Sequence, residues 1–342
     1  MKILYHIKYP QGIGADRFIY EGYKHAWEDN GHQFFTFSEG DDLAQKLEEF
    51  RPDLFFTSLT DNYLKTPNDI NIIKRFKVKG MKMFVGVDTF FDEDVSRLAI
   101  LKDPDFADVY YGEKEPELME GFEEKTGKKY NVMPHAADKL NHFPTEPVKK
   151  YRYDIVYLGA KLPMKSRLFT DVLIPLTKNK KYRVGVFGPC WTLKDNLLRG
   201  AQKICQKIKL QKGVSFFNKF RITIPLNEEN QLYSSAKICL NFHERKKDGA
   251  TLNVLNQRTF KIPACGGFEI CDHVPALRKY FNEDEVVIAG LDPQDWFNKI
   301  DYYLNHEKER KAIQEKGTAR ALKDHTYHNR IERILELYNE LL

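Results

Sequence analysis

The 342-residue sequence lacks any apolar run close to the roughly 20 residues that a membrane-spanning helix needs. Its first residues, MKILYHIKYP, contain no apolar segment followed by a small-residue cleavage site, so they predict a first strand rather than a signal peptide. The five cysteines form no C-x-x-C pair and four have apolar neighbours, which favours buried reduced thiols over a zinc site. These absences predict a cytoplasmic protein without a transmembrane segment.

The sequence also lacks the glycine fingerprint of dinucleotide-binding proteins. Residues 12–16 read Gly-Ile-Gly-Ala-Asp between an expected strand and helix, but Arg17 stands where the third glycine of G-x-G-x-x-G belongs. The segment is not a Walker loop either. It is a tight turn without a ligand or, through Gly12, Gly14 and Asp16, an acceptor-binding loop, because glycines let a ligand approach the backbone.

The length of the chain and the distribution of its charge suggest two domains with different binding properties. A hydrophobic content of 42% fits a folded globular protein, and 342 residues favour two domains over one. Residues 1–150 carry 21 basic and 27 acidic residues (net −6), whereas residues 151–342 carry 33 and 22 (net +11). The second half is therefore expected to bind an anion. A small phosphorylated ligand fits better than nucleic acid, because no stretch interleaves basic residues with exposed aromatics.

Apolar segments typical of strands alternate with helical patterns through both halves. Strands are expected at residues 2–7, 32–38, 53–58, 81–88, 109–112 and 130–136, and again at 154–160, 182–188, 237–243, 268–271 and 285–289. Such alternation predicts α/β domains with parallel sheets covered on both faces. The pattern lapses between residues 136 and 152, which indicates a linker. We therefore expect Rossmann-like domains over residues 1–140 and 153–325, and a terminal helix over 326–342 that packs back on the first domain.

Residues 252–281 form the most informative segment, LNVLNQRTFKIPACGGFEICDHVPALRKYF. Leu252, Leu255 and Thr259 recur at helical spacing, Gly266-Gly267 ends that helix, and residues 268–271 predict a buried strand. Asp272 is expected to cap a second helix that begins near residue 274. Such a unit lies beside the crevice where α/β sheets bind phosphate-bearing ligands.

Polar residues at expected strand ends of the first half are candidates for catalysis. Asp88 ends one strand and His135 follows the last, so either could orient or deprotonate an acceptor hydroxyl. His135 could equally be a structural residue of the linker. Residues 92–94 (Asp-Glu-Asp) resemble a metal-binding D-x-D, but acidic residues also favour a helix start, and no metal site is assigned.

Basic residues and glycines of the second half are candidates for binding a diphosphate. Lysines and an arginine follow the strand at 154–160, and His243, Glu244 and Arg245 end the strand at 237–243. The alternative interpretation is a solvated basic surface. The donor-binding candidates are Lys161, Lys165, Arg167, Gly188, Glu244, Arg258, Lys261, Gly266 and Gly267.

The run RTFKIPACGGFEICDHVPALRKYF, together with EVVIAG, D-P-x-x-W and HTYHNR further on, resembles the C-terminal domain of CgeB-like glycosyltransferases, the spore-maturation protein group. The resemblance is specific over residues 154–330. It implies a GT-B fold, in which two Rossmann-like domains with parallel sheets face a central cleft. It also implies a UDP-, GDP- or dTDP-linked sugar donor, no required cofactor or metal, and a hydroxyl acceptor of polysaccharide, glycolipid or protein type.

One feature of related retaining enzymes is missing. They carry two glutamates where this sequence has Asn253 and Lys261, so that donor-binding pair is not transferred, and Glu244 is the candidate carboxylate for ribose or sugar. Inversion and retention both stay open. The sequence therefore predicts a metal-independent glycosyltransferase, and we expect the transferred sugar to be a hexose. The alternative is a two-lobed sensor of sugar phosphates or nucleotide sugars that performs no catalysis.

Overall fold

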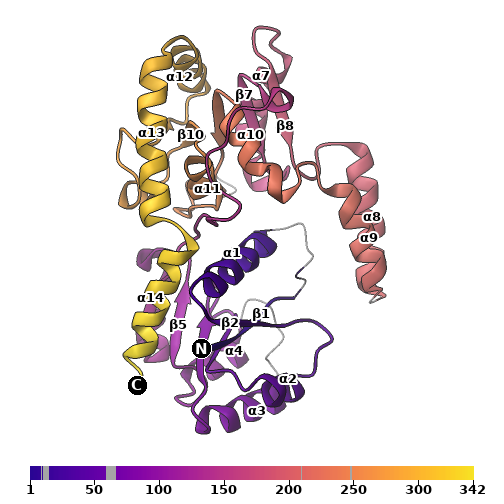
Figure 1. Ribbon diagram of the computed structural model, residues 1–342, viewed down its shortest axis with the longest axis vertical. Helices are drawn as coiled ribbons and strands as arrows, with labels where there is room; N and C mark the ends of the chain where they lie inside the picture. Colours follow the sequence, from indigo (N-terminus) through magenta and orange to yellow (C-terminus); the bar gives the residue numbers. More distant parts are fainter. Residues whose placement is uncertain (9, 11–14, 59–66, 209, 247–248) are drawn as a thin grey trace. The chain divides into compact units, whose positions relative to one another are not determined.

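The computed structural model describes residues 1–8, 10, 15–58, 67–208, 210–246 and 249–342. The chain folds into two compact units, one containing residues up to His135 together with Tyr327–Leu342, the other containing Ala136–Thr326 (Figure 1). Each unit is built on a parallel sheet with helices, which confirms the α/β class expected from the alternating sequence pattern. All five cysteines are free thiols, and four of them are buried.

The first unit is organised on a six-stranded parallel sheet in the order β2-β1-β3-β4-β5-β6. Its strands are short and mostly buried, because both faces of a parallel sheet are covered. The strands are β1 (Lys2–His6), β2 (Gln33–Phe37), β3 (Leu54–Ser58), β4 (Lys82–Gly86), β5 (Val109–Gly112) and β6 (Tyr130–Val132). The helices are α1 (Ala15–Asp29), α2 (Leu43–Phe50), α3 (Pro67–Val78), α4 (Val95–Lys102) and α5 (Phe122–Thr126), with the 3₁₀ helix η1 (Pro116–Met119).

The last helix, α14 (Tyr327–Asn339), belongs to the first unit and packs on α1. The ring of Tyr327 lies so close to Gly22 that a Cβ atom there would overlap it, so the glycine permits the approach of the two helices. Arg330 donates to the carbonyl oxygens of Pro134 (2.9 Å) and His135 (3.0 Å). The end of the chain thus holds the segment that follows β6.

The second unit has a five-stranded parallel sheet in the order β11-β10-β9-β7-β8. Its strands are β7 (Ile155–Leu158), β8 (Val184–Phe187), β9 (Ile238–Asn241), β10 (Glu269–Asp272) and β11 (Val287–Ala289). Its longer helices are α8 (Leu193–Lys207), α9 (Gln211–Arg221), α12 (Pro293–Asn305) and α13 (Glu307–Asp324). Shorter helical segments are η2 (Lys149–Tyr151), η3 (Pro163–Lys165), α6 (Ser166–Leu168), η4 (Phe169–Leu173), α7 (Ile174–Lys178), η5 (Leu226–Glu228), α10 (Glu229–Ser235), α11 (Arg258–Ala264) and η6 (Pro275–Lys279).

Two expectations for residues 252–281 were wrong in detail. The helix starts at Arg258 rather than near Leu252, because Asn253 has a positive φ of 51° and its side chain accepts from the Ala276 amide instead of continuing a helix. Asp272 ends β10 and accepts from the His243 amide, so it does not cap the following helical turn. The loop before α11 is therefore shaped by side-chain hydrogen bonds.

Candidate functional site

The strand order of the second unit identifies the part of its sheet where ligands are expected. β8 lies on one side of β7 and β9 on the other, so the direction of winding reverses between β7 and β9. In open α/β sheets, ligands bind outside the carboxyl ends of the strands at such a switch point. The segments that follow these strands run through η3 and α6 after β7, and through Phe242–Arg245 after β9.

Arg258, the first residue of α11, joins the two segments. Its guanidinium donates to the carbonyl oxygens of Leu158 (2.8 Å) and Phe242 (3.0 Å), to the Tyr157 hydroxyl (3.1 Å) and to Asn241 Oδ1 (3.1 Å). It also lies 5.1 Å from the centroid of the Tyr157 ring, a cation–π distance. Most of its hydrogen-bonding capacity thus holds the ends of β7 and β9 in register with each other.

Two glycines make this close packing feasible. A Cβ on Gly159 would overlap the Arg258 guanidinium, and a Cβ on Gly188 would lie 2.5 Å from the Gly159 carbonyl oxygen. Gly188 also has a φ of 112°, which only glycine adopts without strain, and its amide donates to Thr223 Oγ1 (2.7 Å). Gly188 therefore lies beside the segment that follows β7, where the sequence suggested a donor contact.

Lys165 and Glu244 meet at the same switch point. Lys165 is only 5% exposed, and its Nζ lies 4.0 Å from Glu244 Oε1, whereas the Glu244 side chain is 39% exposed. Burial, helped by the positive charge of Arg258, lowers the pKa of Lys165 to about 7. An ammonium with so low a pKa gains from a nearby anion, because the anion restores the charged form.

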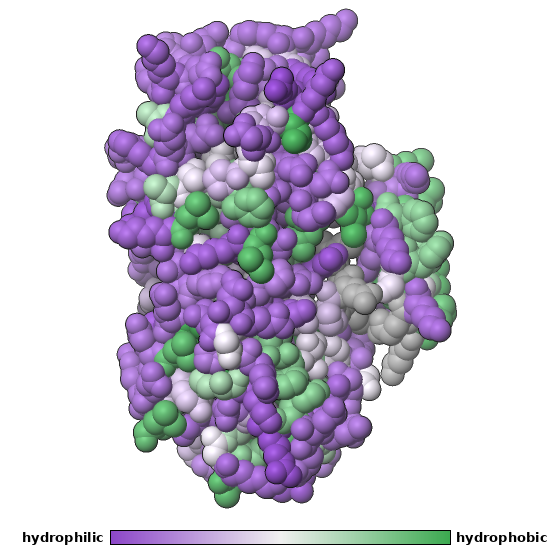
Figure 2. Space-filling model, viewed as in Figure 1, coloured by the Kyte–Doolittle hydropathy of each residue, from purple (hydrophilic) through white to green (hydrophobic). Residues whose placement is uncertain are grey.

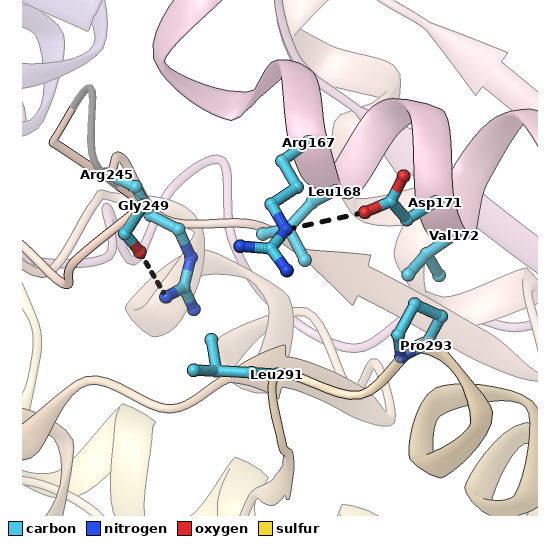
Figure 3. A pocket seen from close by; sticks show the side chains of 8 residues that line it. All are labelled: Arg167, Leu168, Asp171, Val172, Arg245, Gly249, Leu291 and Pro293. Carbon is cyan, nitrogen blue, oxygen red and sulfur yellow. Dashed lines mark hydrogen bonds and ion pairs between the residues drawn. The ribbon is translucent and has the colours of Figure 1, made fainter.

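A pocket opens next to these residues and carries two guanidinium groups (Figure 3). It is shallow and open to solvent, and is lined by Arg167, Leu168, Asp171, Val172, Arg245, Gly249, Leu291 and Pro293. Arg167 is 68% exposed and pairs with Asp171 at 3.5 Å. Arg245 is buried, and in the described part of the chain its Nε has no hydrogen-bond partner. The pocket thus combines two guanidinium groups with apolar side chains such as Leu291 and Pro293.

A buried polar network supports the segment that presents Arg245. Asp272 accepts from Arg245 (2.7 Å) and lies 2.9 Å from His243 Nδ1, while His243 Nε2 lies 2.9 Å from Thr259 Oγ1. Burial alone would raise the pKa of Asp272, but the charges and hydrogen bonds of His243 and Arg245 lower it. Asp272 is therefore ionised and anchors Arg245 in place.

Glu269 lies in the same buried layer and differs from Asp272. Its Oε1 accepts from Asn241 Nδ2 (2.8 Å), and burial raises its pKa to about 8. The carboxyl group is therefore mainly protonated at neutral pH. Sequence reasoning overlooked Glu269, because nothing in the motif FEIC indicates that its glutamate faces inward.

Other donor-binding candidates have different surroundings. The Lys261 ammonium is buried and pairs with Glu229 Oε1 at 2.6 Å, so a phosphate would have to compete with that ion pair. Gly266 and Gly267 precede β10, at the amino edge of the sheet, where Gly266 faces Pro144 and Gly267 faces Ile262. The structure does not bring these three residues to the switch point.

The side chain of Lys161 extends along the neighbouring loop. Its Nζ lies 5.7 Å from the centroid of the Trp191 ring, and Trp191 Nε1 donates to the Gly159 carbonyl (2.7 Å). The amide of Lys161 donates to the Pro189 carbonyl, at the end of β8. Lys161 thus lies on the β8 side of the switch point.

The first unit gathers ionisable groups at the carboxyl ends of β4, β5 and β6. Lys114 Nζ lies 3.1 Å from Glu113 and 3.9 Å from Asp88. Burial lowers the pKa of His135, although the Glu113 carboxylate opposes that shift, so His135 is neutral at neutral pH and can accept a proton. Sequence reasoning singled out Asp88 and His135 but missed Glu113 and Lys114, for which the motif Gly-Glu-Lys after β5 was the available signal.

Of the three residues predicted to bind the acceptor, only Asp16 lies among the described residues. Asp16 lies in the first turn of α1 and is exposed, while Gly12 and Gly14 lie outside the described residues. The D-x-D alternative has protein partners instead of a metal: Asp94 caps the N-terminus of α4, and Asp92 pairs with Lys125. Within the described segments, no group of three or more His, Cys, Asp or Glu side chains is placed to hold a metal ion.

A family model described as glycosyl transferase-like matches residues 167–336, which include most of α6, the segment after β9 and α11. This part of the chain is therefore similar to that family. No curated protein sequence matches the chain significantly.

Solved structures agree with the family match. Sucrose-phosphate synthase from Thermosynechococcus elongatus is 13% identical, with a TM-score of 0.60 over 100% of this chain and 99% of its own. The Anabaena protein HepE in complex with UDP-glucose is 12% identical, with a TM-score of 0.61 over 99% and 100%. An α-glucosyltransferase in complex with UDP and DNA is 10% identical, with a TM-score of 0.61 over 99% of each chain. At these identities the likeness establishes the fold, which is GT-B.

Proposed function

We propose that this protein is a glycosyltransferase of the CgeB-like type that moves a sugar from a nucleotide diphosphate to a hydroxyl acceptor without a metal ion. The observation that supports the proposal is a pocket lined by Arg167 and Arg245, with the buried Lys165 two residues before Arg167 in the same segment after β7. They come from segments after two different strands, so they could surround one small anion. A diphosphate is the anion that best matches three cations beside an apolar surface.

Each part of a nucleotide-sugar donor has a counterpart in this site. The diphosphate would lie against the two guanidinium groups and the Lys165 ammonium. Glu244, the half-exposed carboxylate next to Lys165, would accept hydrogen bonds from hydroxyls of the ribose or the sugar. The apolar side chains of Leu291 and Pro293 would contact the rest of the nucleoside. In the related structures, HepE is in complex with UDP-glucose and UDP, so a uridine donor is the first to test.

Sugar transfer requires positive charge near the leaving diphosphate and a base near the acceptor hydroxyl. As the bond between the anomeric carbon and the diphosphate oxygen breaks, negative charge builds on the leaving group and the nearby cations would stabilise it. The acceptor hydroxyl forms the new bond to the anomeric carbon, and its proton passes to a base. We propose that the first unit supplies that base, His135 or Asp88, because burial keeps His135 neutral.

The experiment is a donor panel followed by a hydrolysis assay. UDP-, GDP- and dTDP-linked sugars are added at saturating concentration, and at least one should raise the melting temperature, since ligand at 100 times Kd adds about 2.7 kcal/mol. Slow release of nucleoside diphosphate should accompany binding. It should be lost in the double variant Lys165→Met and Arg167→Ala but kept in the control Lys178→Ala, a lysine on the surface of the same unit.

Failure takes two recognisable forms. If no nucleotide sugar and no free nucleotide changes the melting temperature, the donor site does not exist and the proposal falls. If a nucleotide sugar binds but no acceptor or water ever releases nucleoside diphosphate, the protein is a nucleotide-sugar sensor rather than an enzyme.

A further inference from the structure

The hairpin of α8 and α9 turns large apolar side chains outward. Six residues are each at least 55% exposed and are called the apolar face here: Leu193, Leu197, Ile204 and Ile208 of α8 and its C-terminal cap, and Phe216 and Phe220 of α9. The α8 residues recur at spacings of four, seven and four, so they form one stripe along the helix. Figure 1 places the two helices side by side, and Figure 2 shows apolar residues along the outer edge of this hairpin, with hydrophilic residues beside them.

The inner side of the hairpin holds a buried ion pair beside the apolar side chains of Cys205 and Val214. Arg221 of α9 donates to Asp195 Oδ1 of α8 at 2.8 Å and also to Gln202, and all three side chains are buried. An amphipathic helix normally turns its apolar face to the core and its polar face to water. Here an ion pair joins the helices while leucine, isoleucine and phenylalanine face outward. An exposed apolar surface of this extent indicates that something covers it.

The hairpin also carries a large net positive charge. Residues 193–222 hold eight lysines and arginines and one acidic residue, Asp195, for a net charge of +7 out of the +11 carried by residues 151–342. Asp195 is neutralised inside the hairpin by Arg221. Exposed lysines, among them Lys203 and Lys207 one turn apart, therefore border the apolar face without acidic residues from the hairpin beside them.

We propose that the α8–α9 hairpin binds the surface of an anionic phospholipid membrane. The apolar face would enter the boundary between headgroups and acyl chains, and the lysines that border it would contact lipid phosphates. The charge of the hairpin favours a membrane over a second copy of the chain as the partner. A symmetric dimer through this face would bring two segments of net charge +7 together, and they would repel each other. Among the residues that the structure describes, no helix is long and apolar enough to cross a bilayer, so the contact is with the membrane surface.

The test measures how the full-length protein partitions onto vesicles. Sedimentation with vesicles of phosphatidylcholine plus phosphatidylglycerol is compared with phosphatidylcholine alone, at low and high salt. We expect binding to the anionic vesicles that weakens with salt. The double variant Leu197→Gln/Ile204→Gln removes apolar area, and Lys203→Glu/Lys207→Glu reverses charge. Each double variant should lower the vesicle partition coefficient at least about tenfold. For the lysine pair, the reason is that one basic residue at such a surface raises the partition coefficient about fivefold.

Matched controls carry the same changes outside the hairpin. Val78→Gln/Val95→Gln alters two valines of the first unit that are as exposed as the apolar face, and Lys178→Glu/Lys180→Glu reverses two exposed lysines of the second unit. Neither pair should change partitioning. All variants should keep the melting temperature of the parent protein, because the altered side chains are exposed.

Three results would overturn the proposal. The first is no preference for anionic vesicles, or a preference that the hairpin variants leave unchanged. The second is a dimer in sedimentation velocity that Leu197→Gln/Ile204→Gln dissociates, which would make the apolar face an interface between copies. The third is loss of UDP-induced stabilisation in the hairpin variants, which would assign the face to the nucleotide site. The membrane proposal does not depend on the transferase proposal, and vesicle binding can succeed where donor hydrolysis fails.

Discussion

Replacing Lys165 by methionine should stabilise the fold and abolish donor binding. Lys165 is 5% exposed, and its ion-pair partner, the Glu244 carboxylate, is 4.0 Å away and 39% exposed. Burial lowers the pKa of the ammonium from 10.5 to about 7, so the folded protein holds this charge against a desolvation cost. Methionine has a similar length and no charge. A residue that costs stability but binds the leaving group is expected of a functional site.

The magnitude follows from proton linkage. Between about pH 7 and pH 10.5 the unfolded chain binds the lysine proton and the folded chain does not, so wild-type stability rises with pH in that window. Below about pH 7 both states bind the proton, and the penalty is fully present. At about 1.4 kcal/mol for each pKa unit, the penalty has an upper bound of about 5 kcal/mol. Relaxation around the charge reduces it, and we expect Lys165→Met to gain about 2 kcal/mol at neutral pH and nothing near pH 10.5.

The assay is urea unfolding of wild type and variant across this pH range, combined with calorimetric titration of UDP. The control is Lys161→Met, an exposed lysine in the same segment, which should change stability by less than about 0.5 kcal/mol at every pH. The reasoning is refuted if Lys165→Met is less stable than wild type below about pH 7, or if it binds UDP as tightly as wild type does.

Three other substitutions or treatments give further tests. Glu229→Gln leaves the buried Lys261 ammonium uncompensated and should cost about 3 kcal/mol in urea unfolding. The stability difference between wild type and Glu229→Gln should be fully present above about pH 4.5 and should fade as the pH falls toward 2. The pKa of Glu229 in the folded protein is about 2, so the wild-type ion pair is itself lost at that pH. A stability difference that does not change with pH would contradict this prediction. Arg167→Ala should leave stability within about 0.5 kcal/mol, since its side chain is mostly exposed, yet weaken UDP binding about tenfold in calorimetry, and unchanged affinity would remove Arg167 from the site. Donor hydrolysis should continue in excess EDTA, and a loss that Mg²⁺ restores would show that the reaction needs a metal.

Much of the fold was predictable because parallel α/β sheets leave a direct pattern in the sequence. Each buried strand is a short apolar run, and each crossover is a helical stretch, so the two sheets could be expected with approximately correct strands. The α9 helix was missed for a physical reason. Its pattern puts Phe216 and Phe220 on the outside, which is not the arrangement of a core-facing helix.

The candidate site was predictable to the level of the loop but not of the side chain. Strand ends can be located from sequence, and Lys165, Arg167 and Glu244 do lie after β7 and β9. The environment of each charge depends on contacts made by residues far away in the chain. Lys261 pairs with Glu229, 32 positions earlier, and Arg258 binds the backbone at Leu158, 100 positions earlier. The sequence identified Arg258 and Lys261 as donor-binding candidates, but it could not indicate which partner each cation meets.

The charge asymmetry between the two halves illustrates why composition alone cannot locate a site. A net charge of +11 in residues 151–342 agreed with a phosphate-binding domain, and that agreement supported the interpretation of the sequence. Seven of those charges belong to residues 193–222, however, while Arg258 and Lys261 are occupied by internal partners. The positive charge at the proposed nucleotide site therefore comes from a few residues, and Lys165 is the one whose charge is most easily lost. Donor affinity should consequently depend on the protonation of a single buried lysine, and not on the overall basicity of the domain.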